Sequence, residues 1–255
     1  MKIKLNIIRK FVPISFYRKL LNQTINRYIG LMDGKILDIG GEKENQVDSW
    51  NKNKLLNSVI TYVNINKRYS PDILASAYDI PVKDKSYDVV FCFELLEHLE
   101  EPSLALKEIS RILKINGRAF ISMPFMYRHH PNPNDFQRWT QEKIQIELNK
   151  NLFEVEFFES RGGWLIVLMD ILINGLTGFR KRTLISFIIW LMIQVFVKSI
   201  LFISPIIIWF DKMILKSDLH SNYYRYSTGF FAVVKKVKNK RKLIIKDYMR
   251  YPKKI

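Results

Sequence analysis

The side chains best suited to chemistry in this 255-residue sequence are a few histidines with acidic neighbours. There are four histidines, and imidazole is the side chain whose unperturbed pKa suits proton transfer near neutral pH. His98 follows Glu94 and Glu97, and residues at i, i+3 and i+4 share one face of a helix. His130 lies shortly before Asp135. Both groups are candidates for acid–base chemistry on an oxygen nucleophile.

Composition excludes sites that need more than one cysteine. The single cysteine, Cys92, cannot form an intramolecular disulfide framework or a multi-cysteine zinc site. It lies inside an apolar run, so we expect a core position. Low cysteine use favours a reducing, cytoplasmic location.

Alternating strand and helix patterns must position these side chains. A near-continuous apolar run at Tyr87–Phe93 is typical of a strand covered on both faces. A helix is expected at 102–115, where Asn116-Gly117 would stop it, and another at Thr140–Asn151 with Thr140 at its N-cap. Further strands are predicted at Lys35–Gly41, Val59–Asn66, Pro71–Ala77, Arg118–Phe125, Phe153–Glu159 and Gly229–Val237. The pattern predicts an α/β fold with helices on both faces of a largely parallel sheet.

Two glycines end the first predicted strand. In a doubly wound sheet a cofactor lies beyond the carboxyl ends of the strands. Gly40 and Gly41 fall at that point, where glycine lets the backbone approach a ligand closely.

An ordered series of motifs strengthens this interpretation. The series is Leu37-Asp38-Ile39-Gly40-Gly41, Pro71 to Ala77, Ile80-Pro81, Tyr87 to Cys92, Glu94 to Leu99, Leu106 to Ile109 and Gly117-Arg118. It resembles the class I S-adenosylmethionine-dependent methyltransferases of the type 11 group. The resemblance implies a Rossmann-like, seven-stranded methyltransferase sheet whose last strand runs antiparallel between the fifth and sixth.

The resemblance also implies a cofactor, S-adenosylmethionine, and residues that would bind it. These are Asp38, Gly40 and Gly41, with Asn66 near the ribose, Ser76 and Ala77 near the adenine, and Phe93. The sequence departs from the family pattern at several of them. Glu42 and Glu44 replace the second and third motif glycines, and Asn66 and Ser76 replace the usual acids.

A second series, from Pro124-Phe125 through His130-Pro131 to Arg138-Trp139-Thr140, is similar to methyltransferases found among bacterial surface-glycan genes. In that group the segment lies over the active site. The resemblance makes His130, His98 and Asp135 candidate catalytic residues and makes Arg138 and Trp139 candidate acceptor contacts. Alternatively, His130 orders the loop, and Asp135 and Arg138 pair with each other.

A metal site is a further possibility. The set Glu94, Glu97 and His98, with His129 or His130 as a fourth ligand, resembles the metal site of small-RNA 3′-end methyltransferases and of some ubiquinone-pathway O-methyltransferases. Glu97-His98 is, however, ordinary for the type 11 group, most of which need no metal. We therefore expect none.

The net charge of +17 is unevenly distributed. Residues 29–159 carry 16 basic and 20 acidic side chains, whereas residues 1–28 carry seven basic and no acidic ones, and 211–255 carry 13 and three. A nucleic-acid enzyme would show its basic patch on the catalytic domain, so we expect an anionic membrane surface as partner and no nucleic acid.

Two strongly apolar stretches lie between the last two predicted strands, at Trp164–Phe179 and Leu184–Phe210. Both predicted strands belong to one sheet, so a single membrane crossing is excluded. Ser186, Trp190, Gln194 and Lys198 form a narrow polar stripe, which favours a helix lying in the membrane interface, and Pro205 should kink or end it. The alternative is a lid or a homo-oligomer interface.

The predicted organisation has four parts. They are a basic N-terminal helical segment at 1–28, a methyltransferase domain at 29–160 plus 222–238, an apolar helical insertion at 161–221 and a basic tail at 239–255. The predicted function is O-methylation of a lipid-linked or surface-glycan acceptor, by a peripheral or monotopic enzyme at the inner face of the cell membrane. The alternatives are a methyltransferase for a membrane-soluble quinone precursor and a catalytically silent partner protein.

Overall fold

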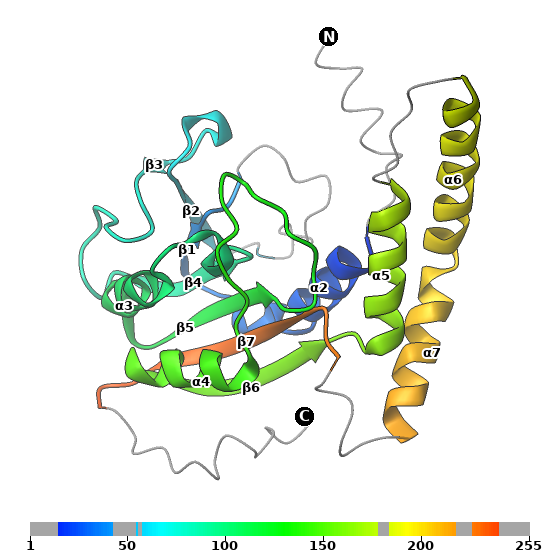
Figure 1. The fold of residues 1–255 in the computed structure, drawn as a ribbon. Coiled ribbons are helices and arrows are strands. Elements are labelled where there is room, and N and C mark those ends of the chain that lie inside the picture. The colour runs from blue at the N-terminus through cyan, green and yellow to red at the C-terminus, as the bar shows by residue number, and fades with distance from the viewer. Residues whose placement is uncertain (1–14, 43–54, 56–57, 178–183, 218–225, 240–255) are drawn as a thin grey trace. The chain divides into compact units, whose positions relative to one another are not determined.

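The computed structural model describes residues 15–42, 55, 58–177, 184–217 and 226–239 (Figure 1). The first fourteen residues of the predicted N-terminal segment and residues 240–255 of the predicted tail lie outside these. Two compact units are present. The larger contains the described residues of 24–125, 129–159 and 230–255, and the smaller those of 1–23, 126–128 and 160–229.

The chain forms seven strands and six longer helices within the described residues. The strands are β1 (Lys35–Ile39), β2 (Val59–Asn64), β3 (Ile73–Leu74), β4 (Tyr87–Phe93), β5 (Leu113–Pro124), β6 (Phe153–Arg161) and β7 (Gly229–Lys236). The helices are α2 (Phe16–Arg27), α3 (Pro102–Ile112), α4 (Gln141–Lys150), α5 (Trp164–Thr177), α6 (Leu184–Phe202) and α7 (Ser204–Ser217). Short 3₁₀ turns are η1 (Ile29–Leu31), η4 (Lys67–Tyr69) and η5 (Leu96–His98).

The strands form one sheet in the order β3-β2-β1-β4-β5-β7-β6. The pairs from β3 to β5 are parallel. β7 runs opposite to its neighbours (Figure 1), and Thr228 N donates to Arg161 O while Val237 N donates to Leu152 O, both at 2.9 Å, as an antiparallel pair requires. The predicted Rossmann-like, seven-stranded methyltransferase sheet is confirmed, with its last strand between the fifth and sixth.

β4 shows why its sequence is apolar throughout. Val90 and Cys92 face the core that α3 and α4 cover. Phe91 and Phe93 face the opposite side of the sheet, where the Phe93 ring stacks on Phe231 at 6.0 Å. Both faces are therefore buried, and the predicted core position of Cys92 is confirmed.

Several predicted boundaries are wrong. The strand expected at Arg118–Phe125 extends from Leu113 to Pro124, because Leu113 already pairs with Tyr87 of β4. The helix expected at 102–115 ends at Ile112, because Lys85 N and Ser86 N donate to the carbonyls of Arg111 and Ile112 and divert the chain into β5. Asn116, with φ of 67°, marks an irregularity inside β5 instead of a helix stop. The third strand, expected at Pro71–Ala77, is limited to Ile73–Leu74.

The predicted break at Pro205 is confirmed. α6 ends at Phe202 and α7 begins at Ser204, because a proline at 205 cannot donate to the carbonyl of Leu201. Lys19 Nζ at 2.9 Å and Ser204 Oγ at 2.6 Å bond that carbonyl instead.

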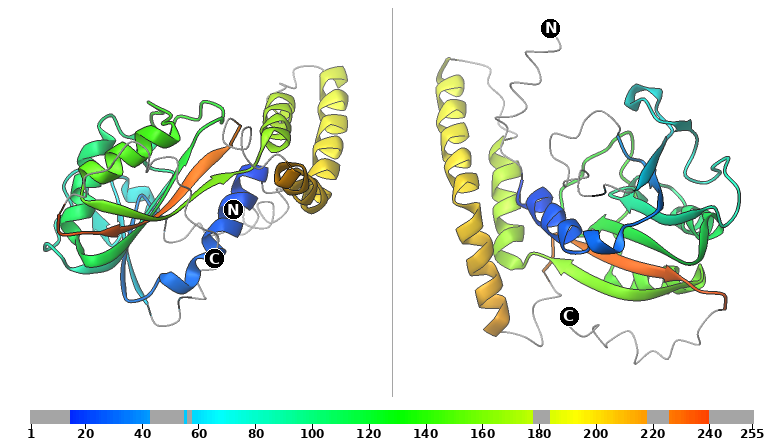
Figure 2. Two further views of the ribbon diagram at one scale, coloured as in Figure 1. Left: turned by 90° about the horizontal axis from the view of Figure 1, so that it is seen from below. Right: turned by 180° about the vertical axis from the view of Figure 1, so that it is seen from behind.

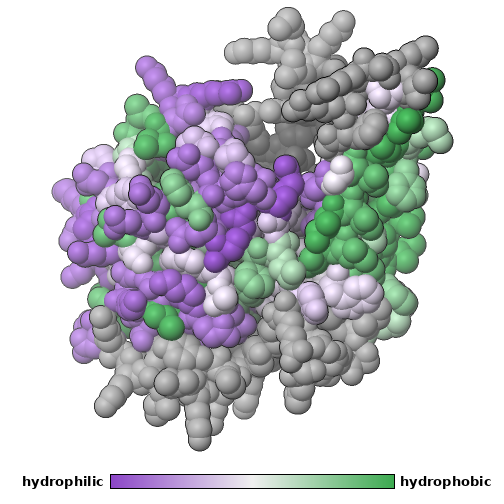
Figure 3. Space-filling model, in the orientation of Figure 1, coloured by the Kyte–Doolittle hydropathy of each residue, from purple (hydrophilic) through white to green (hydrophobic). Residues whose placement is uncertain are grey.

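The smaller unit has its own core and an exposed apolar surface. The core contains Phe16, Leu20, Ile166, Ile173, Val197, Leu201 and Ile208. Outward-facing side chains on α5, α6 and α7 include Met192, Phe202 and Ile206, which are 68%, 85% and 65% exposed. In Figure 3 hydrophobic residues colour most of the visible surface of these helices.

Among the described helices, none alone has the length and apolar composition to cross a membrane. Ser186–Phe202 and Ser204–Met213 together reach that length, but their axes are bent by 54°.

The larger unit has helices on both faces of its sheet. α3 and α4 cover one face, and the last turn of α2 reaches the other (Figure 2). There Arg27 Nη1 lies 2.6 Å from Glu159 Oε2. Thr140 caps α4 by accepting a hydrogen bond from Lys143 N at 3.3 Å, as predicted. These helices leave the carboxyl ends of β1, β2 and β4 to be shaped by loops.

Candidate active site

The turn after β1 lies at the carboxyl edge of the sheet. Gly40 has φ of +80°, a backbone conformation that glycine adopts without strain. A Cβ at Gly41 would lie 2.4 Å from Cγ of Asp38, so only glycine lets this backbone pass the buried carboxylate. Asn64, at the end of β2, donates to the carbonyls of both glycines at 3.2 and 3.3 Å. The turn is therefore held in a fixed shape.

The other predicted cofactor residues lie along the same edge. Asn66 accepts a hydrogen bond from Arg68 N at 3.0 Å and so caps η4. Ser76 Oγ accepts from Tyr78 N at 3.2 Å, next to the buried Ala77. Both polar side chains already stabilise local turns, which orients them but uses one acceptor site of each oxygen.

β4 ends in a strained residue. Glu94 has φ of +50°, which is uncommon for a residue with a side chain. Its Oε1 accepts from Ser122 Oγ at 2.6 Å. This turn redirects the chain into η5, which carries Glu97 and His98. The i, i+3, i+4 helical face expected for Glu94, Glu97 and His98 does not form, because the segment is a strand end followed by a 3₁₀ turn.

The structure brings Glu97, His98 and His130 together. The Glu97 side chain is fully buried. Its Oε1 lies 3.8 Å from Nε2 of His98 and 3.8 Å from Nε2 of His130. Neither carboxylate oxygen has a hydrogen-bond partner among the described residues. One ligand atom from each of the three residues lies within 4.8 Å of the other two. His129, the fourth member of the predicted metal set, is exposed and is not part of this group.

The loop after β5 holds the two imidazoles in place. His98 Nδ1 lies 2.5 Å from the carbonyl of Asn134. His130 Nδ1 lies 3.2 Å from Asp135 Oδ2, and Asp135 also accepts from the main-chain N–H of His130 at 2.8 Å. Arg138 binds both oxygens of Asp135. The pairing of Asp135 with Arg138 and the ordering of the loop by His130 were both left open by the sequence, and the structure shows both.

The charges of the group are strongly perturbed. Burial raises the pKa of the Glu97 carboxyl well above its usual range, and the charge of Glu94 adds to that rise. The hydrogen bonds from Arg138 hold the pKa of the Asp135 carboxyl well below its usual range. The pKa values of two carboxyl groups near His130 are therefore shifted in opposite directions. Such shifts are common at sites that transfer protons or bind cations.

Two predicted site residues lie elsewhere. Trp139 packs in the core, and its indole N–H donates to Gln137 Oε1 at 2.7 Å. Phe93 is half-buried between other rings on the sheet face opposite α3 and α4. Both side chains contribute to packing in this structure.

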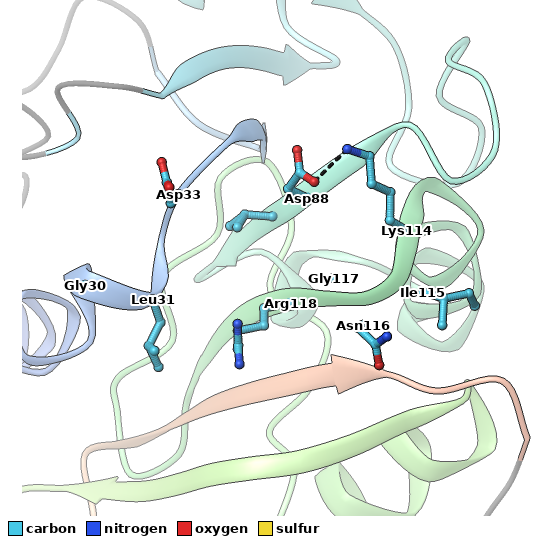
Figure 4. Close-up of a pocket in the computed structure, with 10 residues that line it drawn as sticks. Gly30, Leu31, Asp33, Asp88, Lys114, Ile115, Asn116, Gly117 and Arg118 are labelled. Atoms are coloured by element: carbon cyan, nitrogen blue, oxygen red, sulfur yellow. Dashed lines mark hydrogen bonds and ion pairs between the residues drawn. The ribbon is translucent and has the colours of Figure 1, made fainter.

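A cavity of about 330 Å³ lies at the opposite edge of the sheet (Figure 4). It is lined by the segment before β1 and by the amino ends of β4 and β5. Most of its charged groups are paired, since Asp88 binds Lys114 at 2.6 Å and Arg118 binds Glu156 at 2.6 Å. The paired charges favour the carboxyl edge as the functional site.

Comparison with known proteins identifies a methyltransferase domain in the chain. Residues 44–121 match the family model of a methyltransferase domain. The O-methyltransferase resE of Aspergillus sclerotiorum is 34% identical over 72 residues, which are 28% of this chain and 27% of that protein. The chain therefore spans about a quarter of the length of this relative.

Solved structures match over most of the chain. A SAM-dependent methyltransferase from Archaeoglobus fulgidus has a TM-score of 0.50 at 16% identity, covering 86% of this chain and 94% of that one. The chain has the class I methyltransferase fold. The [4+2]-cyclase SpnF has a TM-score of 0.51 at 15% identity, covering 87% of this chain and 81% of that one. A protein named as a cyclase thus has the same methyltransferase fold, so the activity must be argued from the site.

The predicted glycine turn and the predicted pair Glu97-His98 lie at the same, carboxyl edge of the sheet. The sequence did not indicate that His130, and not His129, would face Glu97. The sequence did offer one indication, because Asp135 and Arg138 follow His130 closely. A carboxylate that pairs with an arginine can also hold a nearby histidine in one orientation.

Proposed function

We propose that this chain is an S-adenosylmethionine-dependent methyltransferase that methylates a hydroxyl oxygen. The observation that carries the proposal is the meeting of two features at one edge of the sheet. A Cβ at Gly40 would lie 3.1 Å from Leu95, so the glycine turn touches the segment that carries Glu97 and His98. A place for a cofactor and a group able to accept a proton are therefore neighbours.

The cofactor residues fit this role in part. Gly40 and Gly41 leave the backbone accessible, and Asp38 supplies a buried carboxylate beside them. Asn66, Ser76 and Ala77 would contact the ribose and adenine, whereas Phe93 packs against other rings and is not assigned to the cofactor. S-adenosylmethionine supplies the electrophilic methyl group on a positively charged sulfur.

The reaction requires alignment and removal of a proton. The oxygen–carbon bond forms as the carbon–sulfur bond breaks, and the acceptor hydroxyl loses its proton. Holding the two reactants in line can account for about 7–11 kcal/mol of the barrier. His130 and His98 are assigned to the removal of the proton, and Asp135 keeps His130 in position.

The acceptor is proposed to be lipid-linked or part of a surface glycan. The exposed apolar side chains of α5, α6 and α7 support attachment to a bilayer, as does the basic charge of the segments outside the sheet. We place the protein at the inner, anionic face of the cell membrane, without a crossing. A membrane-soluble quinone precursor is the second candidate acceptor, and the exposed apolar helices favour it equally.

Methyl transfer from radiolabelled S-adenosylmethionine tests the proposal. The full chain is incubated with fractions containing polar glycolipids, quinone precursors or soluble metabolites from bacterial membranes. Label in the glycolipid fraction is expected, and it should be lost with Gly41→Val. Label only in the quinone fraction would show that the acceptor is a quinone precursor and not a glycolipid. No label in any fraction would favour a catalytically silent protein.

A further inference from the structure

The Glu97 carboxylate and two imidazole nitrogens converge, and neither carboxylate oxygen has a hydrogen-bond partner among the described residues. The carbonyl of Asn134 can only accept, so His98 Nδ1 must carry the proton of a neutral ring and Nε2 presents its lone pair to Glu97. His130 Nδ1 lies 3.2 Å from Asp135 Oδ2 and 3.3 Å from Arg138 Nη2, so both residues hold the ring by the nitrogen that faces away from Glu97.

The distances distinguish a shared proton from a cation. A hydrogen bond between Glu97 and either ring would need about 2.7–3.2 Å, whereas both separations are 3.8 Å. Ligand atoms about 2.0–2.2 Å from a tetrahedral ion lie roughly 3.4 Å apart. The spacing is thus closer to that of ligands around an ion.

We propose that Glu97, His98 and His130 bind one divalent transition-metal ion. Two imidazoles and one carboxylate suit zinc, manganese, cobalt or iron, and they are poor ligands for magnesium. A fully buried carboxylate without a hydrogen-bond partner is the second, independent observation that points to a cation. The ring contacts with Asn134 and Asp135 are the outer hydrogen bonds that fix metal-binding histidines elsewhere.

With the ion bound, the two imidazoles would serve as ligands in place of their role as bases, because the ion would use both Nε2 lone pairs. Three protein ligands would leave a coordination position for an acceptor hydroxyl, whose pKa a divalent ion would lower, and its proton would pass to water. This consequence rests on the proposed methyl transfer, but the binding of the ion does not.

Metal binding by the full chain tests the proposal without any assay of activity. Protein stripped with a chelator is titrated with Co²⁺, whose visible absorption reports its ligands, and with Zn²⁺ by calorimetry. One ion per chain is expected. His98→Ala, His130→Ala and the near-isosteric Glu97→Gln should each weaken binding by about 100-fold or more, since each removes one of three ligands.

Two further variants make the test specific. His129→Ala alters the adjacent, exposed histidine and should leave affinity unchanged. Asp135→Asn keeps the side-chain shape but weakens the hold on His130, so affinity should fall by about 10–100-fold and the Co²⁺ spectrum should shift.

The proposal is overturned if less than one ion binds per folded chain, or if His129→Ala weakens binding as much as His130→Ala. Circular dichroism of each variant identifies unfolded protein, and Glu97→Gln remains informative if an alanine variant unfolds. S-adenosylmethionine binding is measured in the same preparations. Cofactor binding without metal binding would reject the metal site alone, and metal binding without cofactor binding would reject the proposed function alone.

Discussion

The two compact units both bury carboxylates, but they surround them differently. In the sheet unit, Glu97 is faced by two imidazole nitrogens and has no hydrogen-bond partner among the described residues. In the helical unit, Asp211 on α7 accepts a hydrogen bond from Gly163 N at 2.9 Å, at the start of α5. The first carboxylate faces two potential metal-binding nitrogens, whereas the second serves as a helix cap.

Burial of an acid is therefore a poor guide to function by itself. Asp170 on α5 is as buried as Asp211, and burial raises its pKa to about 7. No described metal-binding group includes it. The convergence of further ligand atoms, held by their own hydrogen bonds, is what separates Glu97 from the acids of the helical unit.

The largest expected effect concerns the glycine turn of the sheet unit. Gly41→Val places a side chain against the Asp38 carboxylate, so affinity for S-adenosylmethionine should fall by about 100-fold or more. Calorimetric titration of folded protein measures the change. Gly30→Ala is the matched control, because its Cβ would meet nothing within 4 Å. Equal affinity in both variants would show that the cofactor does not lie over this turn.

The helical unit should account for membrane attachment. Met192→Gln, Phe202→Gln and Ile206→Gln together remove three exposed apolar side chains, each contributing about 1.5 kcal/mol or more when buried in lipid. Co-sedimentation with anionic vesicles should weaken by more than about 100-fold.

The control for that experiment lies in the sheet unit. Val59→Gln and Ile65→Gln change side chains that are equally exposed, at 70% and 72%, and should leave vesicle binding unchanged. If they weaken binding as much as the triple variant, attachment is not a property of the helical unit.

Asp170 gives the helical unit a pH dependence. Its folded-state pKa is raised from 3.8 to about 7, so the folded state binds the extra proton between these values. Stability contributed by this group is present below about pH 4 and is lost as pH rises toward 7.

Asp170→Asn should remove this dependence. The variant should gain up to about 4 kcal/mol in free energy of unfolding at pH 8 and little at pH 4. Denaturant unfolding at both pH values measures the difference. An equal change at both pH values would show that Asp170 does not titrate in this range.

The smallest expected effect is on the α5 cap. Asp211→Ala removes the acceptor for Gly163 N and should lower the free energy of unfolding by about 1 kcal/mol. Asp211→Asn retains an oxygen and should lose less, which thermal denaturation of the two variants compares. If Asp211→Asn lowered the free energy of unfolding more than Asp211→Ala does, the capping role would be contradicted.

Local sequence signals predicted much of the fold. The bounds of β4 are as expected because burial on both faces imposes a continuous apolar run. Thr140 and Pro205 were also correctly placed, since a cap and a missing N–H act on their own chain segment.

The features that were missed depend on contacts distant in sequence. α3 ends early because Lys85 and Ser86 bond its last carbonyls. His130 faces Glu97 because Asp135 holds it and because Phe136 N donates to the Glu97 carbonyl at 2.8 Å. The residue pattern of a single helix or strand does not reveal contacts of this kind.

Titration of the full chain with S-adenosylmethionine tests most directly whether this chain binds a methyl donor. We expect binding of one cofactor per chain at micromolar strength, because Asn64 holds the turn at Gly40 and Gly41 in a fixed shape. Absence of heat up to millimolar cofactor, with the protein folded and its acceptor fraction present, would contradict the assignment of this chain as a methyltransferase.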